Sequence, residues 1–157
     1  MNMVRFAVLE DAEQINVLRK EVNSLHVSGR PHHFKAGFNK ELQEHVYLYL
    51  TGGIGYAVVE EQDGKIIGMV MVDYIDRPES PYRYAERFAH IAEICVDENH
   101  RKQGVGKRLM DFVKADAKAK GLSRIELDVW AFNDALGFYE AEGFTVFRRY
   151  LEYDLGK

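Results

Sequence analysis

The stretch Arg101-Lys102-Gln103-Gly104-Val105-Gly106-Lys107 decides the fold of this chain. It stands between an apolar segment, Ile91 to Val96, that predicts a strand, and a long amphipathic segment that predicts a helix. The first N–H groups of a helix lack partners within it, and with the positive end of the helix dipole they bind anions. Without Cβ atoms, Gly104 and Gly106 would let phosphate approach the backbone, and three cations of the stretch add charge. We therefore expect a phosphorylated cofactor here.

Two common phosphate-binding loops do not fit these residues. A Walker loop needs Ser or Thr after its lysine, but Arg108 follows Lys107. The Rossmann fingerprint needs a third glycine or an alanine at position 109, where Leu109 stands. The loop therefore belongs to another class of phosphate site.

The pattern Arg-x-x-Gly-x-Gly after a strand ending at Val96 is similar to the acetyl-coenzyme A loop of the GNAT superfamily of N-acetyltransferases. The stretch from Val129 to Phe144, VWAFNDALGFYEAEGF, resembles the next motif of that family: a strand, an Asn, a short helix with Phe-Tyr, and Gly-Phe. The resemblance covers the order of elements over the whole chain and the specific motifs from Ile91 to Phe144.

The resemblance implies that this chain binds acetyl-coenzyme A. The implied cofactor-binding residues lie on the strand end, the glycine loop and the second motif: Ile94, Cys95, Val96, Arg101, Lys102, Gln103, Gly104, Val105, Gly106, Lys107 and Asn133. In the family the Asn side chain holds the pantetheine arm, a role that would fall on Asn133. The step from Asn133 to Tyr139 is six residues, shorter than is usual in the family.

The resemblance also implies the chemistry: a neutral amine attacks the acetyl thioester directly. Tyr139 is then the expected general acid, because its phenol can donate a proton to the departing sulfur. The backbone N–H groups around Ile94 to Val96 would hold the carbonyl oxygen. Without the motif, Phe138 and Tyr139 would be interpreted as aromatic core residues.

Three residues remain candidates for the general base. Strict alternation on the strand from His90 to Val96 puts His90 on one face of the sheet and Glu93 on the other. His90 is favoured, acting through a water, because histidine can accept a proton near neutral pH. Glu93 is second, and a bulge in the strand would reverse the parity. Asp128 is third; each of the three is also compatible with a surface or salt-bridged side chain.

Composition limits the class of protein. A chain of 157 residues that is 46% hydrophobic fits one domain, residues 1–157. We expect a cytoplasmic protein, since no apolar run is long enough to span a membrane and the first residues lack a signal-peptide layout. The single cysteine, Cys95, agrees with a reducing compartment. The net charge of −4 argues against nucleic acid and leaves a cationic substrate favourable. We leave a homodimer open.

The pattern of the chain predicts an α/β fold with one mixed sheet and helices on both faces. The resemblance implies that this fold is of the GNAT-like N-acyltransferase type, with a central, mostly antiparallel sheet. The expected strands are 4–8, 55–60, 65–75, 90–96, 124–129 and 144–154, the last as one strand or a pair. The expected helices begin near 10, 39, 104 and 135, and a loop is expected over 76–86.

Other signals favour structure over chemistry. Cys95 lies within an apolar run and is expected to be a buried thiol, with no role as a nucleophile. The histidines near His32-His33 lack the companions of a metal site, so no metal is expected. In relatives the region matching His26 to Phe38 walls the acceptor pocket, and Tyr82-Arg83-Tyr84 would form the opposite wall. The function expected is acetyl transfer to a small-molecule or peptide amine; the alternative is a non-catalytic acyl-coenzyme A binding or sensing module.

Overall fold

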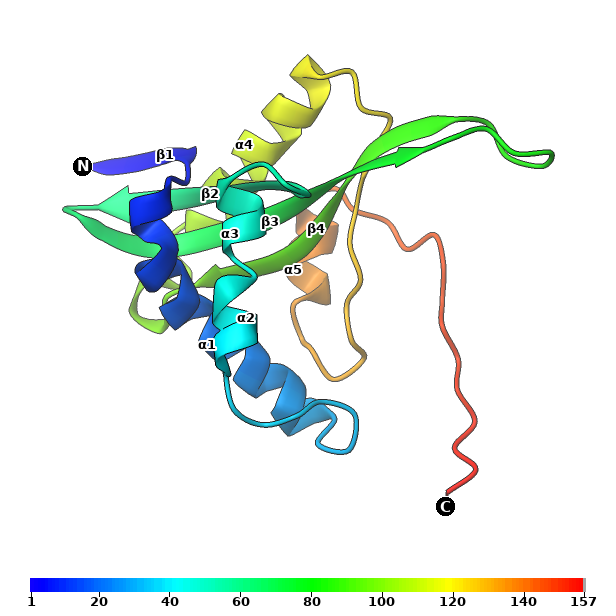
Figure 1. Ribbon diagram of the computed structural model, residues 1–157, viewed down its shortest axis with the longest axis horizontal. Helices are drawn as coiled ribbons and strands as arrows, with labels where there is room; N and C mark the ends of the chain where they lie inside the picture. The colour runs from blue at the N-terminus through cyan, green and yellow to red at the C-terminus, as the bar shows by residue number, and fades with distance from the viewer. Residues whose placement is uncertain (157) are drawn as a thin grey trace.

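The computed structural model describes residues 1–156 and shows one curved sheet with helices against both of its faces (Figure 1). The strands are β1 (Asn2–Phe6), β2 (Gly55–Gln62), β3 (Lys65–Arg77), β4 (Glu86–Val96) and β5 (Ile125–Glu126). The α-helices are α1 (Ala12–Gly29), α2 (Lys40–Glu44), α3 (Tyr47–Leu50), α4 (Val105–Ala119) and α5 (Leu136–Ala141). Two 3₁₀ turns, Leu9–Asp11 and Glu98–His100, precede α1 and the glycine loop.

The sheet has the strand order β1-β2-β3-β4-β5, with three antiparallel pairings and a final parallel one between β4 and β5. The β2–β3 hairpin turns at Asp63 and Gly64, whose φ angles of 51° and 81° are both positive. A two-residue turn with two positive φ values matches the twist of antiparallel strands. The predicted hairpin is thus confirmed.

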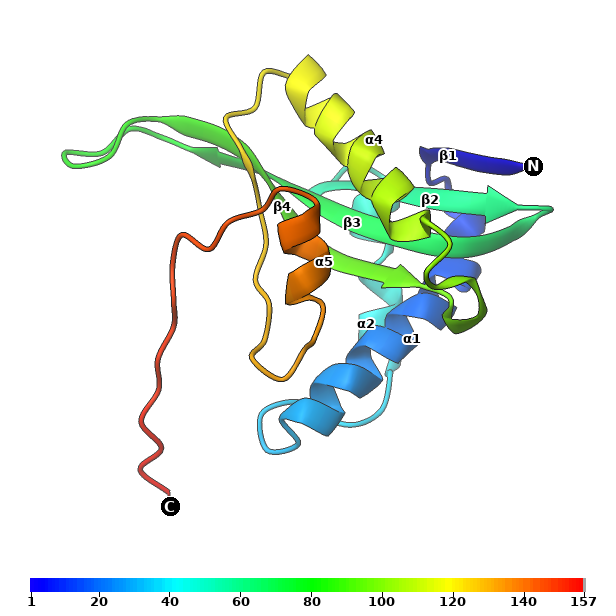
Figure 2. The same cartoon turned by 180° about the vertical axis from the view of Figure 1, so that it is seen from behind.

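Each face of the sheet has its own apolar core. Leu109, Met110 and Val113 of α4 pack with Tyr139 of α5 against one face, where Ala89 and Ile91 of β4 meet them. On the other face, α1 and α3 cover Met69, Met71 and Cys95; their own core residues there are Ala12, Ile15, Leu18 and Tyr49. Figure 2 shows α4 and α5 together on the side opposite to α1. The predicted α/β fold class, with helices on both faces, is confirmed.

Strand β4 contains a bulge in the middle of the sheet. Glu93 pairs with Met71 and Ile91 pairs with Val72, so that Ala92 is an extra residue without a counterpart on β3. An extra residue reverses the alternation of side chains beyond it. On β4, odd-numbered residues before Ala92 therefore point to one face of the sheet, and odd-numbered residues after it point to the other face.

Several predicted boundaries differ from the structure. The helix expected from residue 39 is split into α2 and α3 around His45, although Asn39 caps α2 as expected by accepting a hydrogen bond from Leu42 N (2.9 Å). The expected loop over 76–86 is shorter, because β3 and β4 extend into it as a long hairpin. The strand expected over 124–129 pairs only at Ile125 and Glu126.

The predicted strand over 144–154 is wrong for this structure. Within residues 144–156 no strand is assigned, and the segment runs as an extended chain away from the sheet (Figures 1 and 2). A strand needs a neighbour to pair with, and this segment reaches none in the one chain. Across residues 1–156, none of the helices combines the length and apolar character needed to cross a membrane.

Candidate functional site

The glycine loop sits at the start of α4, directly after β4. Gly104 occupies the position before the helix with φ = 80°, a left-handed conformation that favours glycine, and Lys102 is also left-handed at φ = 59°. Gly104 has no side chain that could accept a hydrogen bond from the first N–H groups of α4, so it does not cap them. A helix start of this kind can bind an anion, and the phosphate contact expected from the sequence stays a prediction.

Two of the three cations of the loop are engaged with acidic side chains at the surface. Arg101 donates to the carbonyl of Val96 (3.2 Å) and lies 3.4 Å from Glu21, and Lys107 lies 2.8 Å from Asp111. The hydrogen bond to Asp111 raises the pKa of Lys107 above its usual value. Exposed pairs of this kind are weak and exchange readily. Arg101 and Lys107 can therefore turn toward a bound phosphate.

The edge of β4 that faces away from β3 is open beyond His90. Only Ala89 and His90 pair with β5, after which the chain diverges from β4, as Figure 2 shows. Asp97 N donates toward β3, to Ile67 O (2.9 Å), so by alternation the N–H groups of Ile94 and Val96 point toward the divergence. The carbonyl of Val96, which accepts from Arg101, points the same way. These are the N–H groups that, from the family resemblance, we expect to hold the carbonyl oxygen of the acetyl group.

Tyr139 lies on α5, on the α4 side of the sheet. Its side chain is 7% exposed and packs between Phe138 and Phe144, with ring centroids 5.3 Å and 6.0 Å away. Burial raises the pKa of the Tyr139 phenol, because desolvation disfavours its anion. A phenol that stays protonated at neutral pH can donate a proton.

Asn133 has a local structural use. Its side-chain oxygen accepts a hydrogen bond from Ala135 N (2.9 Å), which fixes the turn that leads into α5. A side-chain amide has both an acceptor oxygen and a donor NH₂ group. The donor end is the part of Asn133 that fits the predicted contact with a pantetheine amide.

His90 and Glu93 lie on the same face of the sheet, which corrects the prediction that they lie on opposite faces. His90 faces the α1 side, opposite to Ala89 and Ile91, and the bulge at Ala92 returns Glu93 to that side, where its carboxylate receives a hydrogen bond from Arg19 Nε (2.8 Å). His90 Nδ1 lies 3.5 Å from Glu126 and its Nε2 lies 4.0 Å from Asp128. The three candidate bases thus share one face.

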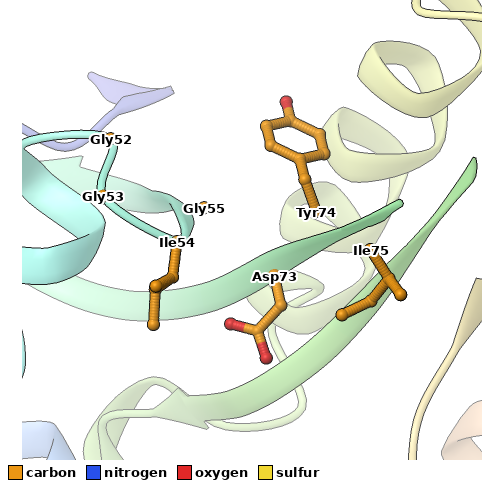
Figure 3. Close-up of a pocket in the computed structure, with 7 residues that line it drawn as sticks. All are labelled: Gly52, Gly53, Ile54, Gly55, Asp73, Tyr74 and Ile75. Atoms are coloured by element: carbon orange, nitrogen blue, oxygen red, sulfur yellow. The ribbon is translucent and has the colours of Figure 1, made fainter. Parts of the chain in front are cut away.

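That face is rich in carboxylates. Asp73 stands opposite His90 on β3 and accepts a hydrogen bond from the Tyr49 hydroxyl (2.6 Å). Burial raises the pKa of Tyr49, and this hydrogen bond raises it further. Figure 3 shows Asp73 and Tyr74 pointing to opposite sides of β3, where an open pocket of about 590 Å³ lies beside Gly52 to Gly55. This pocket lies one strand away from the divergence, so we assign it no part of the cofactor.

Sequence reasoning missed Arg19, Tyr49, Asp73 and Trp130. Arg19 is 2% exposed; it joins α1 to Glu93 and to the carbonyl of Leu42, and it also donates to Asn16 within α1. The available sequence signal was an arginine on the apolar face of a predicted amphipathic helix, because a charge buried there needs a partner. Asp73 carried a weaker signal, as an acidic residue inside an apolar strand pattern. Nothing local in the sequence distinguishes Tyr49.

The two predicted walls of the acceptor pocket have different outcomes. Part of the His26 to Phe38 segment forms an aromatic cluster with Trp130: Phe34 lies 5.4 Å from the Trp130 ring, and His26 stacks on Phe34 at 5.1 Å. Tyr82 and Tyr84 instead lie near the tip of the β3–β4 hairpin, 82% and 87% exposed, far from the divergence (Figure 1). The prediction of the second wall is therefore wrong, because β3 and β4 continue into the expected loop and carry these tyrosines away from the sheet.

Cys95 is buried, as expected, and burial raises the pKa of its thiol to about 12. A thiol of this kind is a poor nucleophile. Among residues 1–156, no group of three His, Cys, Asp or Glu side chains is arranged to hold a metal ion. The expectation of a metal-free site stays a prediction.

The family model "Acetyltransferase (GNAT) family" matches residues 20–144, and the chain belongs to this family. Among curated proteins it is similar to N-acetyltransferase 8 of Homo sapiens, with 31% identity over 87 residues that cover 55% of this chain and 37% of that protein. It is also similar to the N-terminal acetyltransferase B complex catalytic subunit naa20 of Schizosaccharomyces pombe, with 28% identity over 106 residues, 67% of this chain and 57% of that one. The chain thus spans well under two thirds of the length of these relatives.

Solved structures share the fold over nearly the whole chain. A point mutant of the BH1408 protein from Bacillus halodurans matches with a TM-score of 0.92 and 26% identity, covering 98% of this chain and 99% of that chain. The structure of AAC(6')-Iy in complex with the bisubstrate analog CoA-S-monomethyl-acetylneamine matches with a TM-score of 0.75 and 19% identity, over 98% of this chain and 97% of that one. The second likeness shows the fold alone.

Proposed function

We propose that this protein transfers the acetyl group of acetyl-coenzyme A to the primary amine of a small molecule or peptide by direct attack. The observation that carries the proposal is the arrangement around the divergence of β4 and β5. The glycine loop and Tyr139 lie on the α4 side of the sheet, His90 lies on the α1 side, and the N–H groups of Ile94 and Val96 point into the divergence between them.

The residues at the start of α4 fit a phosphorylated cofactor. The helix start supplies N–H groups, Gly104 presents no Cβ, and the exposed cations Arg101, Lys102 and Lys107 surround it. Acetyl-coenzyme A would supply the acetyl group as an activated thioester. The N–H groups beyond the bulge would hold its pantetheine arm and its carbonyl oxygen, with Asn133 donating from the far side.

The proposed proton transfers use one residue on each face. A ring nitrogen of His90 accepts the proton of the substrate ammonium, directly or through a water, and Glu126 at 3.5 Å stabilises the charged ring. The Tyr139 hydroxyl donates its proton to the departing sulfur. Glu93 is committed to the buried Arg19, which leaves it in a supporting electrostatic role.

We further propose that the acceptor is a cationic amine. Four carboxylates lie on the His90 face: Asp73, Glu93, Glu126 and Asp128. Arg19 and Arg124 neutralise two of them, which leaves Asp73 and Asp128 to attract a cation. The similar proteins include both an aminoglycoside N-acetyltransferase and an N-terminal acetyltransferase subunit, so both small-molecule and peptide amines belong in a test.

A cytoplasmic, one-domain enzyme is part of the proposal, on the grounds of its composition and its single buried cysteine. The competing function is a non-catalytic acyl-coenzyme A sensor. It would use the same loop but would have no need for a protonated phenol on one face of the sheet and an imidazole on the other.

Release of the coenzyme A thiol, followed with a thiol-reactive dye, tests the proposal. The panel contains an aminoglycoside, a polyamine, a peptide with a free N-terminus and a neutral amine of similar size. We expect release with at least one cationic amine and much less with the neutral one. Thermal stabilisation by acetyl-coenzyme A without release from any amine would favour the sensor, and neither binding nor release would contradict both functions.

A further inference from the structure

Glu60 of β2 carries a fully buried carboxylate on the α4 side of the sheet. Its exposed fraction is 0%, and Tyr56 and Val58, which share its face of the strand, belong to the apolar core beneath α4. A buried charge is costly unless it is paired and hydrogen-bonded. None of the proton transfers proposed above uses this carboxylate, so its place in the core needs another reason.

The partner of Glu60 is Arg108, in the first turn of α4, the helix that packs across β2, β3 and β4 (Figure 2). Arg108 Nη2 donates to Glu60 Oε1 (2.7 Å), and Arg108 Nε lies 3.1 Å from both carboxylate oxygens. Asn2 of β1 donates a further hydrogen bond to Glu60 Oε1 (2.8 Å). Several charge-assisted hydrogen bonds fix geometry as well as charge. The guanidinium of Arg108 is therefore held in one orientation.

The other end of this guanidinium binds the backbone of the glycine loop. Arg108 Nη1 donates to the carbonyl of Gln103 (3.0 Å). Gln103 stands between Lys102 and Gly104, whose φ angles of 59° and 80° are both left-handed. A left-handed conformation is unfavourable for lysine, so the loop needs contacts that hold it. Arg108 supplies one, and the Gln103 side chain, which donates to Asn99 O (3.0 Å), supplies another.

The contact with Arg108 also sets the direction of an N–H group. The peptide between Gln103 and Gly104 is trans, and in a planar trans peptide the C=O and the following N–H point in opposite directions. Because the Gln103 carbonyl is turned toward Arg108, the N–H of Gly104 points away from it. If this peptide turned over, the loop would present a carbonyl oxygen in place of an N–H, and a carbonyl oxygen repels phosphate.

We propose that Glu60 and Arg108 are positioning residues for the anion site at the start of α4. The buried carboxylate orients the guanidinium, and the guanidinium holds the peptide between Gln103 and Gly104 with its N–H presented to the phosphates of the cofactor. Glu60 neutralises Arg108, so this arginine acts through the backbone of the loop and does not bind phosphate itself. The inference rests on the proposed binding of acetyl-coenzyme A by this loop.

A double variant tests the positioning role without leaving a buried charge. Removing Arg108 alone would leave Glu60 charged and unpaired in the core, which threatens the fold. Glu60→Gln/Arg108→Met removes both charges and the donor to the loop. Calorimetry with coenzyme A should give a dissociation constant about 10- to 100-fold above that of the parent protein, the effect of losing a hydrogen bond to a charged group.

The matched control is Arg5→Met/Asp11→Asn, on the other face of the sheet. Arg5 pairs with Val59 of the α1-side core, and it too joins an almost fully buried carboxylate, that of Asp11 (2.7 Å), to a backbone carbonyl (3.2 Å). The control removes the same kind of ion pair at a place that does not touch the glycine loop. It should lose stability and keep the parent affinity for coenzyme A.

A donor without phosphates separates positioning from a general loss of structure. S-acetylpantetheine has the thioester and the pantetheine arm but carries no phosphate. In Glu60→Gln/Arg108→Met, kcat/KM should fall by about tenfold or more with acetyl-coenzyme A and change by less than about twofold with S-acetylpantetheine. Equal losses with both donors would show that the pair supports only the fold.

Hydrogen exchange of the protein without ligand tests the same contact independently of the proposed function. In the double variant, amides 102–106 should exchange faster, while those of the β2–β3 hairpin turn keep the parent rate. Unchanged exchange at 102–106 would overturn the positioning role, as would an unchanged dissociation constant for coenzyme A. A parent protein that does not bind coenzyme A would instead contradict the proposed function. Thermal unfolding checks the double variant, and Glu60→Gln, which keeps the shape of the side chain, replaces it if it does not fold.

Discussion

The two faces of the sheet differ in the charge that they offer a ligand. The α4 side has an uncapped helix start with three exposed cations near it, and an apolar core that contains Tyr139. On the α1 side, His90 lies among four carboxylates, two of which have arginine partners. The first face suits an anionic cofactor and the second suits a cationic amine.

The comparison shows how one interrupted strand serves both faces. Strand β4 pairs with β5 over two residues only, and its bulge at Ala92 brings Glu93 to the side of His90. The same divergence leaves the N–H groups of Ile94 and Val96 pointing between the two ligands. If this account is correct, substitutions in the loop before α4 must weaken cofactor binding, whereas substitutions of Tyr139 and His90, one on each face, must both lower turnover.

The largest expected effect is that of Tyr139→Phe. The change removes only the hydroxyl, so turnover should fall by about 10²–10⁴-fold while affinity for acetyl-coenzyme A is retained. Tyr56→Phe is the matched control, because Tyr56 is 8% exposed in the same core but lies on β2, away from the divergence. A folded Tyr139→Phe protein with the parent turnover, measured where chemistry is rate-limiting, removes Tyr139 from the mechanism.

Variants of His90 and Glu93 distinguish the roles of these two residues on the α1 side. His90→Gln should lower turnover by about 10²-fold and abolish the acidic limb of the pH profile of kcat/KM. Glu93→Gln should instead lower the free energy of unfolding by a few kcal/mol, because it leaves the buried Arg19 without its carboxylate. An altered pH profile in the Glu93 variant, with a normal one in the His90 variant, would exchange their roles.

A smaller effect is expected at Gly104, where a matched glycine lies at the other end of the same helix. Gly104 and Gly121 both have left-handed φ angles, 80° and 66°, so replacing either by Ala should cost about 1–2 kcal/mol of stability. A Cβ at Gly121 meets open space, whereas one at Gly104 would lie 2.8 Å from Arg108 Nη1, the end of a flexible side chain that must shift. Only Gly104→Ala should also weaken acetyl-coenzyme A binding several-fold, measured by calorimetry. Equal affinities in the two variants would show that the loop does not contact the cofactor.

Gly106 is a poorer probe than the sequence suggests. A Cβ at this position would lie 3.1 Å from the Phe138 ring, so Gly106→Val disturbs α5 as well as any phosphate.

The smallest expected effect concerns a carboxylate that serves stability alone. Arg5 donates two hydrogen bonds to Asp11 (2.7 Å and 3.0 Å) and holds the pKa of that carboxyl below its usual value. A lowered pKa in the folded state adds stability above the unfolded value of about 3.9, and this is lost as the pH falls. Asp11→Asn should therefore cost about 1–3 kcal/mol at pH 7 and less at pH 3, by urea unfolding. A cost independent of pH would contradict the ion pair.

Sequence reasoning predicted the elements whose signals are local. The turn at Asp63-Gly64, the cap at Asn39 and the helix between Gly104 and Gly121 all lie within one residue of their predicted places. Each depends on backbone preferences of a few adjacent residues. The family, too, was identified from contiguous motifs.

Features that depend on distant partners were not predictable in this way. The bulge at Ala92 exists only in the pairing of β4 with β3, so alternation alone misplaced Glu93. The contact between Arg19 and Glu93 joins residues 74 positions apart. The segment 144–154 has the composition of a strand, but a strand also requires an edge, and the single chain does not bring it to one.

Hydrogen exchange measured with and without acetyl-coenzyme A tests the division between the two faces most directly. The account predicts slower amide exchange at residues 94–96, 101–108 and 133–139 on cofactor binding, and no change over residues 26–38. Adding a cationic acceptor in the presence of coenzyme A should then slow exchange in the segment 26–38. Protection of 26–38 by acetyl-coenzyme A alone, with none at 101–108, would contradict the account.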